Sequence, residues 1–79
     1  NLNMFIMEEF IKNFYEILDD VEIDSIDKDT DYKSLEDWDS MTKLMLIAMV
    51  HEKYEKQISG NDINQSITLE HLHSRIQSI

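Results

Sequence analysis

The sequence predicts an all-α fold, a small four-helix bundle with three main helices, one short helix and a long first loop. The chain has 79 residues, of which 42% are hydrophobic. That composition suits a single domain, residues 1–79, built around one core. It contains no proline and only one glycine, Gly60, which disfavours the hairpins that need turn glycines. Apolar residues also recur at intervals of three and four positions, the period of a helix.

The first helix is predicted over residues 2–18, followed by a polar loop over residues 19–39. Loops of this length in a compact domain usually carry a function. The apolar residues at helical spacing are Phe10, Phe14, Ile17 and Leu18, with Leu2, Phe5 and Ile6 near the same stripe.

The second helix is predicted to begin at Ser40, with Asp39 as its N-cap, and to run to about Tyr54 or Lys56. Residues 44–50 are all apolar and therefore cover the whole circumference of this helix. Met45 and Met49 fit either a core or an adaptable recognition surface, and the core is slightly favoured. The face expected to be buried carries Leu46, Ile47, Val50 and Tyr54.

The remaining elements are shorter. Gly60 is predicted to end the region after the second helix, and a short helical turn is expected over residues 61–65. Thr68 is predicted to cap a last helix, whose apolar stripe is Leu69, Leu72 and Ile76.

Charge is unevenly distributed along the chain. Residues 1–39 hold 13 acids and 3 bases, a net of −10, whereas residues 40–79 hold 4 of each. Nucleic acid is therefore an unfavourable partner, and a basic protein surface is a favourable one. The absence of cysteine excludes a disulfide, a thiolate metal site and a cysteine nucleophile. No apolar run approaches a membrane span and no signal-peptide pattern is present, so we expect a cytoplasmic protein.

Three candidate sites lack the residue spacing that their function requires. Residues 27–31 imitate the start of a calcium loop, but Tyr32 occupies the glycine position and Trp38 the closing glutamate position. The three histidines form no recognisable ligand set and are expected to be surface or half-buried residues. Ser40 lacks the glycines of a hydrolase nucleophile elbow.

Ser40 instead stands where an acidic loop meets the start of an apolar helix, a junction that suits a phosphate-linked group. Asp39-Ser40-Met41 resembles the Asp-Ser-Leu motif of the acyl carrier protein family, and the resemblance spans nearly the whole chain. The spacing that carries it comprises Tyr32 eight residues before the serine, and Leu46-Ile47, Tyr54, Ile58, Thr68-Leu69 and Ile76 after it.

The resemblance implies a carrier that is not itself an enzyme. A phosphopantetheinyl transferase would attach a 4′-phosphopantetheine arm to Ser40, flanked by Asp39 and Met41, and the arm would hold acyl groups as thioesters. Partner enzymes with basic patches would load and use them. The expected partner-binding residues are Asp37, Trp38, Leu44, Met45 and Glu52, and a cleft lined by Leu44, Leu46 and Ile47 could hold the chain.

Departures from the family pattern indicate a specialised stand-alone carrier. Where carriers of central fatty-acid synthesis place acids along the second helix, this chain has Thr42, Met45 and His51, with only Glu52 acidic. Two alternatives stay open: an aminoacyl, peptidyl or D-alanyl carrier, and an unmodified acidic interaction module. A monomer is expected.

Overall fold

The computed structural model describes the backbone of residues 2–19 and 21–79, and the side chains of residues 6–19 and 21–79. This part of the chain is helical and confirms the predicted all-α class. Its elements are α1 (Leu2–Tyr15), the 3-10 turns η1 (Ile23–Ser25) and η2 (Tyr32–Ser34), α2 (Ser40–Tyr54), α3 (Gly60–Asn64) and α4 (Leu69–Gln77).

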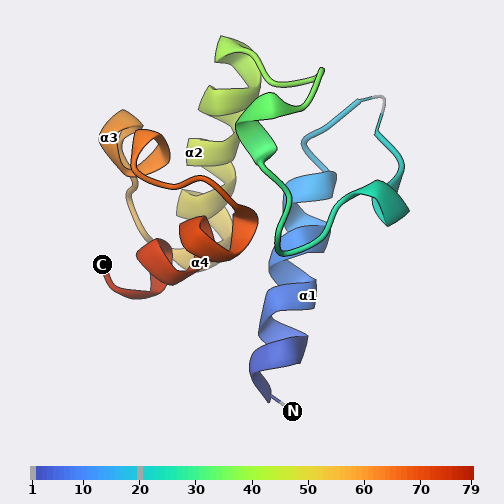
Figure 1. Cartoon of the computed structure of the whole chain (residues 1–79). Coiled ribbons are helices and arrows are strands. Elements are labelled where there is room, and N and C mark those ends of the chain that lie inside the picture. Colours follow the sequence, from blue (N-terminus) through green and yellow to red (C-terminus); the bar gives the residue numbers. More distant parts are fainter. Residues whose placement is uncertain (1, 20) are drawn as a thin grey trace.

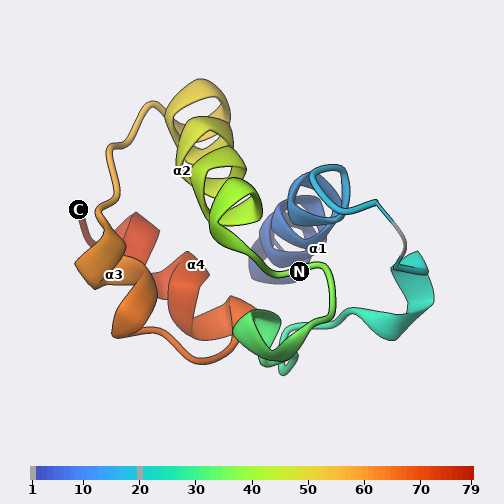
Figure 2. The same ribbon diagram turned by 90° about the horizontal axis from the view of Figure 1, so that it is seen from above.

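The four helices form a small bundle in which α1 contacts both α2 and α4, while α3 packs on α4. Figures 1 and 2 show α1 beside α2, and α4 between α1 and α3. The loop between α1 and α2 leaves α1 on the side of the bundle away from α3 and then crosses toward α4 and α3, where η2 lies. The start of α2, the position of the Asp39-Ser40 junction, lies at the opposite end of the molecule from the start of α1.

The core draws on every helix and on the long loop, which contributes Ile26 and Tyr32. Phe10 and Phe14 face inward from α1, as their spacing predicts. The buried apolar side chains are Phe10, Phe14, Ile26, Tyr32, Leu46, Met49, Val50, Ile58, Ile63, Leu69, Leu72 and Ile76.

Helix α1 is shorter than predicted, because its α-helical pattern ends at Tyr15 instead of residue 18. The amides of Ile17 and Leu18 bond to the carbonyls of Phe14 and Tyr15, three residues back. This tighter turn is a common way to close an α-helix. Both side chains still pack against the core. The predicted positions of Leu2 and Phe5 on the apolar stripe concern side chains outside the described part.

Gly60 begins α3 and does not end the preceding region, which corrects the prediction. The cause is a capping box: the Asp62 amide donates to Ser59 Oγ, and the Ser59 amide donates to Asp62 Oδ2. Helix α2 ends before this segment, at Tyr54. Its C-cap is Glu55, whose backbone is left-handed with φ 55°.

The apolar run in α2 divides between core and surface. Leu46, Met49 and Val50 are buried. Ile47 and Tyr54, predicted to be buried, are half-buried against the same core. Met45 is 39% exposed, so the slight preference for a core position is wrong there. The elements that pack on α2 cover only part of its circumference. Because seven consecutive apolar residues extend around the whole circumference, some of them remain exposed.

The long loop is held to α3 and α4 by hydrogen bonds. The first free amides of α4, those of Leu69 and Glu70, donate to the carbonyls of Thr30 and Lys28. The third, that of His71, donates to Thr68 Oγ1 at 3.1 Å, which confirms the predicted cap. No helix within the described residues combines the length and the hydrophobicity needed to cross a membrane.

Candidate functional site

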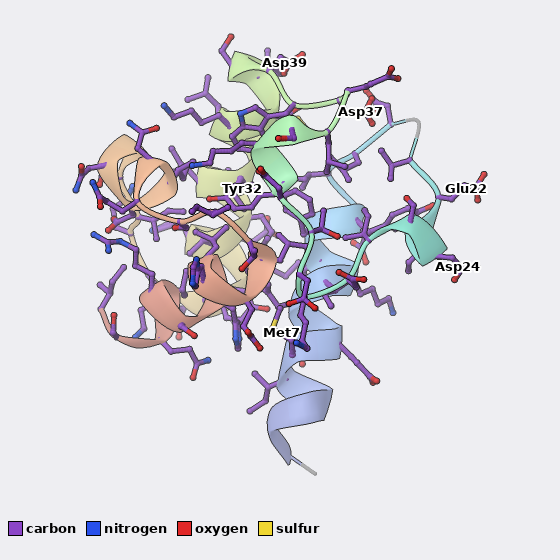
Figure 3. The ribbon with its side chains drawn as sticks, in the orientation of Figure 1. Met7, Glu22, Asp24, Tyr32, Asp37 and Asp39 are labelled. Atoms are coloured by element: carbon purple, nitrogen blue, oxygen red, sulfur yellow. The ribbon has the colours of Figure 1, made fainter. Side chains whose placement is uncertain are left out.

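Asp39 caps α2 and sets the position of the residue that follows it. Its backbone is extended, and its carboxylate Oδ1 accepts a hydrogen bond of 2.8 Å from the Thr42 amide. Bonds from the backbone and hydroxyl of Thr42 lower the pKa of Asp39 below its ordinary value. The carboxylate is therefore ionised at neutral pH, at the positive end of the helix dipole. Figure 3 shows Asp39 at the start of α2, with Asp37 on the loop leading to it.

Ser40 is the first residue of α2, and its side chain is exposed. Its hydroxyl can therefore be reached by a macromolecule approaching from the loop side. The first amides of a helix have no acceptor within the helix, so they favour an anionic group placed beside them. An exposed hydroxyl at such a place suits conversion to a phosphodiester, whose negative charge the helix start tolerates.

Thr42 is hydrogen-bonded to both Asp37 and Asp39, which precede Ser40. Besides its bond to Asp39, its buried side chain donates from Oγ1 to the Asp37 carbonyl at 2.8 Å. The Asp37 carboxylate in turn accepts from the Asp19 amide at 3.0 Å, so it joins the two ends of the long loop. Sequence reasoning did not single out Thr42 as a site residue. The Asp-x-x-Thr spacing of a helix cap was the available signal.

Trp38 is half-buried and anchors the loop to the core. Its ring lies edge-on to that of Tyr32, with centroids 5.4 Å apart and an interplanar angle of 80°. Tyr32 is fully buried and makes a similar contact with Phe14 at 5.9 Å. Trp38 thus holds the segment before Ser40 against the bundle, while the residue remains partly exposed.

The other residues expected to meet a partner, Leu44, Met45 and Glu52, lie on the surface of α2, as does Met41, which was expected to flank the arm. Met41 and Leu44 are 63% and 61% exposed, and Met45 follows one turn after Met41. Glu52 is exposed further along the helix. Large apolar side chains this exposed next to Ser40 form a contact surface of the kind that recognition sites use.

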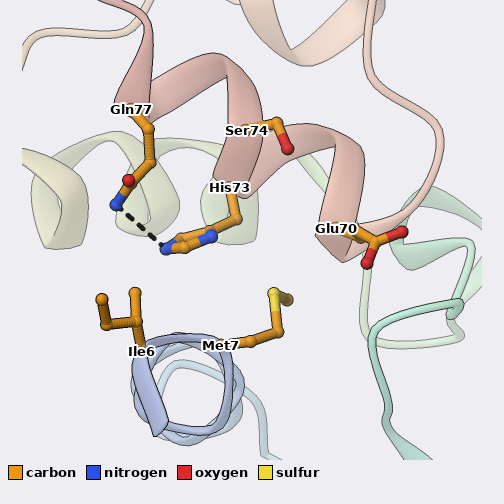
Figure 4. A pocket seen from close by; sticks show the side chains of 6 residues that line it. All are labelled: Ile6, Met7, Glu70, His73, Ser74 and Gln77. Atoms are coloured by element: carbon orange, nitrogen blue, oxygen red, sulfur yellow. Dashed lines mark hydrogen bonds between the residues drawn. The ribbon is translucent and has the colours of Figure 1, made fainter. Parts of the chain in front are cut away.

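Two surface grooves flank α1. The first, about 370 Å³ in volume, separates α1 from α2 and is lined by Met45, Met49 and Glu52 among others. The second, about 400 Å³, separates α1 from α4 at the other end of α1. In Figure 4, Ile6 and Met7 face Glu70, His73, Ser74 and Gln77 across it.

The three residues expected to line a cleft for the chain do not line the groove between α1 and α2. Leu46 is fully buried in the core, Leu44 is largely exposed, and neither residue lines the groove beside α2; nor does Ile47. That groove opens on the side of α2 that faces α1, where Met45 and Met49 lie. A run of seven apolar residues is hydrophobic on every face of the helix. The sequence therefore could not predict which face lines the groove.

The histidines stand as expected, with His51 and His71 exposed and His73 half-buried. The His73 ring lies 5.0 Å from the Phe10 ring, and burial lowers the pKa of His73. Across the described residues, no three of the acidic or histidine side chains are grouped closely enough to hold a metal ion.

Comparison of the chain with protein-family models, curated proteins and solved structures returned no match. Function must therefore be argued from the residues and their geometry.

Proposed function

We propose that this chain is a specialised stand-alone acyl carrier, with Ser40 as the attachment point of a 4′-phosphopantetheine arm. One observation carries the proposal: an exposed serine opens α2 directly after an aspartate that caps the helix. The spacing of apolar and aromatic residues around this junction supports it.

The geometry suits the attachment reaction. The Ser40 oxygen would attack the phosphorus of coenzyme A that bears the pantetheine, forming a phosphodiester. The bond between the two phosphates would break, adenosine 3′,5′-bisphosphate would leave, and a base of the transferase would take the hydroxyl proton. Asp39 and Thr42 contribute by fixing the backbone on both sides of Ser40, which reduces the entropy lost when the transferase binds.

The arm would supply a thiol that holds acyl groups as thioesters, and this chain would supply attachment, orientation and recognition. The acids before Ser40 would attract basic surfaces of the transferase and of acyl-using enzymes. The exposed Met41 and Leu44 would add apolar contact beside the arm. Because salt screens exposed charges, partner affinity should fall as ionic strength rises.

Intact mass spectrometry tests the proposal directly. The chain is incubated with coenzyme A and a broad-specificity phosphopantetheinyl transferase, beside Ser40→Ala and the matched control Ser34→Ala, another exposed serine of the same region. We expect one phosphopantetheinyl group on the parent and on Ser34→Ala, and none on Ser40→Ala. Failure of several transferases on folded protein would favour an unmodified interaction module. Subsequent loading by an amino-acid-activating enzyme, but by no acyl-transferring one, would favour the aminoacyl carrier.

A further inference from the structure

The methionines of α2 differ widely in their exposure to solvent. Met41, Met45 and Met49 follow one another on neighbouring turns along one side of the helix. Met41 is 63% exposed and Met45 is 39% exposed, whereas Met49 is buried at 5%. Met7, on α1, is partly buried. Among the methionines whose side chains the structure describes, Met41 is therefore the most accessible to a small molecule in the solvent.

The thioether of an accessible methionine can be oxidised to a sulfoxide, which is polar. A hydroperoxide transfers one oxygen to the sulfur: the O–O bond breaks, an S–O bond forms, and the second oxygen takes up the peroxide proton and leaves as water or an alcohol. The sulfur loses two electrons and the peroxide gains them. Leu44 is nearly as exposed as Met41, at 61%, but has no sulfur for a peroxide to oxidise. Oxidation at this end of α2 is therefore directed to Met41.

Met41 follows Ser40 directly, and both residues are exposed at the start of α2. A protein–protein contact covers roughly 800 Å² on each partner, far more than one residue. An enzyme that reaches the Ser40 hydroxyl therefore also covers Met41. Burying a thioether in such a contact is favourable, because the group is apolar. Burying a sulfoxide is unfavourable unless the enzyme supplies a hydrogen-bond donor, because its oxygen loses water.

We propose that Met41 is an oxidation site that controls access to Ser40: a hydroperoxide converts its thioether to the sulfoxide and so slows attachment of the arm. The consequence rests on the proposed function, whereas the oxidation itself does not. The change is reversible, because methionine sulfoxide reductases restore the thioether, with thiols as the reductant and water as the product. Burial protects Met49, so the core keeps its packing while the surface beside Ser40 changes.

Peptide mapping after graded exposure to hydrogen peroxide tests the order of oxidation. Lys43 lies between Met41 and Met45, so trypsin places these two methionines in different peptides, and fragment ions separate Met45 from Met49. All proteins carry Met4→Leu, which removes the methionine whose side chain lies outside the described part. We expect an added oxygen first on Met41, then on Met45, and last on Met49. Its removal by sulfoxide reductases of both epimer specificities shows that the oxygen is on sulfur.

Rates of arm attachment test the consequence. Each protein is oxidised, freed of peroxide with catalase, and assayed with coenzyme A and the transferase against its own unoxidised form. We expect oxidation to slow attachment to the Met4→Leu protein about tenfold, equivalent to about 1.4 kcal/mol, and reductase treatment to restore the rate. Adding Met41→Leu keeps an apolar side chain of similar volume without the sulfur, so the rate should no longer respond to peroxide. Adding Met45→Leu instead retains Met41 and should leave the response intact.

Each adverse outcome has a distinct meaning. Absence of attachment before oxidation would overturn the proposed function and, with it, the control of access to Ser40; the order of oxidation is measured without a transferase. Oxidation of Met45 or Met7 ahead of Met41, or an unchanged rate of attachment after Met41 is oxidised, would overturn the inference alone. Equal slowing of the Met41→Leu variant would also overturn it, because the responsible oxygen would then lie on another residue.

Discussion

The phenol of Tyr32 donates a hydrogen bond of 3.1 Å to the backbone carbonyl of Ile63, and so joins the long loop to the end of α3. Tyr32 is fully buried, and this burial raises the pKa of its phenol. The same carbonyl also accepts from the Lys33 ammonium at 2.9 Å. One buried residue thus connects the loop before Ser40 with the end of α3.

We expect Tyr32→Phe to lower the free energy of unfolding by about 0.5–1.5 kcal/mol, the usual net value of one hydrogen bond. The ring is retained and the Ile63 carbonyl keeps Lys33 as donor, so the loss should not be larger. Urea denaturation measures it. Tyr15→Phe, at a half-buried tyrosine, is the control and should change stability by less than about 0.5 kcal/mol. Equal effects of the two substitutions would show that the Tyr32 bond contributes nothing specific.

The capped starts of α2 and α4 could be predicted from sequence because capping is local. Asp39 and Thr68 each accept an amide bond from the residue three positions later, and that spacing is visible in the chain. The same local rule also governs α3, where Ser59 and Asp62 outweighed the expectation that Gly60 ends a segment.

The exposed side of α2 could not be predicted, because it depends on which elements pack against the helix. Leu44 and Leu46 have the same side chain and lie two residues apart, yet one is 61% exposed and the other fully buried. In a run of seven apolar residues, hydrophobic periodicity does not indicate which face of the helix is buried. Only the placement of α1 and the other elements reveals that Met45 and Met49 line a groove.

Arg75 holds α3 on α4 through its bond of 2.8 Å from Nε to Asp62 Oδ1. We expect Arg75→Met to cost about 1 kcal/mol, because the pair is charged but the Arg75 side chain is 38% exposed and screened by solvent. The loss should be local, and amide hydrogen exchange should accelerate mainly in α3. Lys28→Met is the control, since the Lys28–Glu70 pair is longer, at 3.9 Å, and more exposed. Comparable acceleration of α3 exchange in both variants would contradict a specific role for Arg75.

His73 should make stability fall on mild acidification. Burial against Phe10 lowers the pKa of His73 below 6.5, its ordinary value, so the unfolded chain binds the proton more readily than the folded one. Its contribution is fully present above pH 6.5 and is lost as the pH falls from there through the lower pKa of the folded state. Facing groups are Glu70, Ser74 and Gln77 from α4, and Ile6 and Met7 from α1.

The variant His73→Leu should remove this part of the pH dependence. Denaturation between pH 7.5 and pH 5 should show wild-type stability decreasing relative to the variant, whereas His71→Leu, at an exposed histidine of the same helix, should track the wild type. If the stabilities of wild type and His73→Leu changed in parallel with pH, His73 would not be the source of this pH dependence. The acidic residues are the same in all three proteins, so their effect cancels in the comparison.

Glu55 offers a test of backbone strain at the end of α2. Its φ of 55° places it in the left-handed region, which costs an L-residue roughly 1–2 kcal/mol and costs glycine little. Glycine loses more conformational freedom on folding, so Glu55→Gly should give a net stabilisation of about 0.5–1 kcal/mol, measured by thermal or urea unfolding. Lys53→Gly, inside α2, should instead destabilise by about 1 kcal/mol. If both glycine variants were destabilised to the same extent, Glu55 would be helical in solution and α2 would continue past Tyr54.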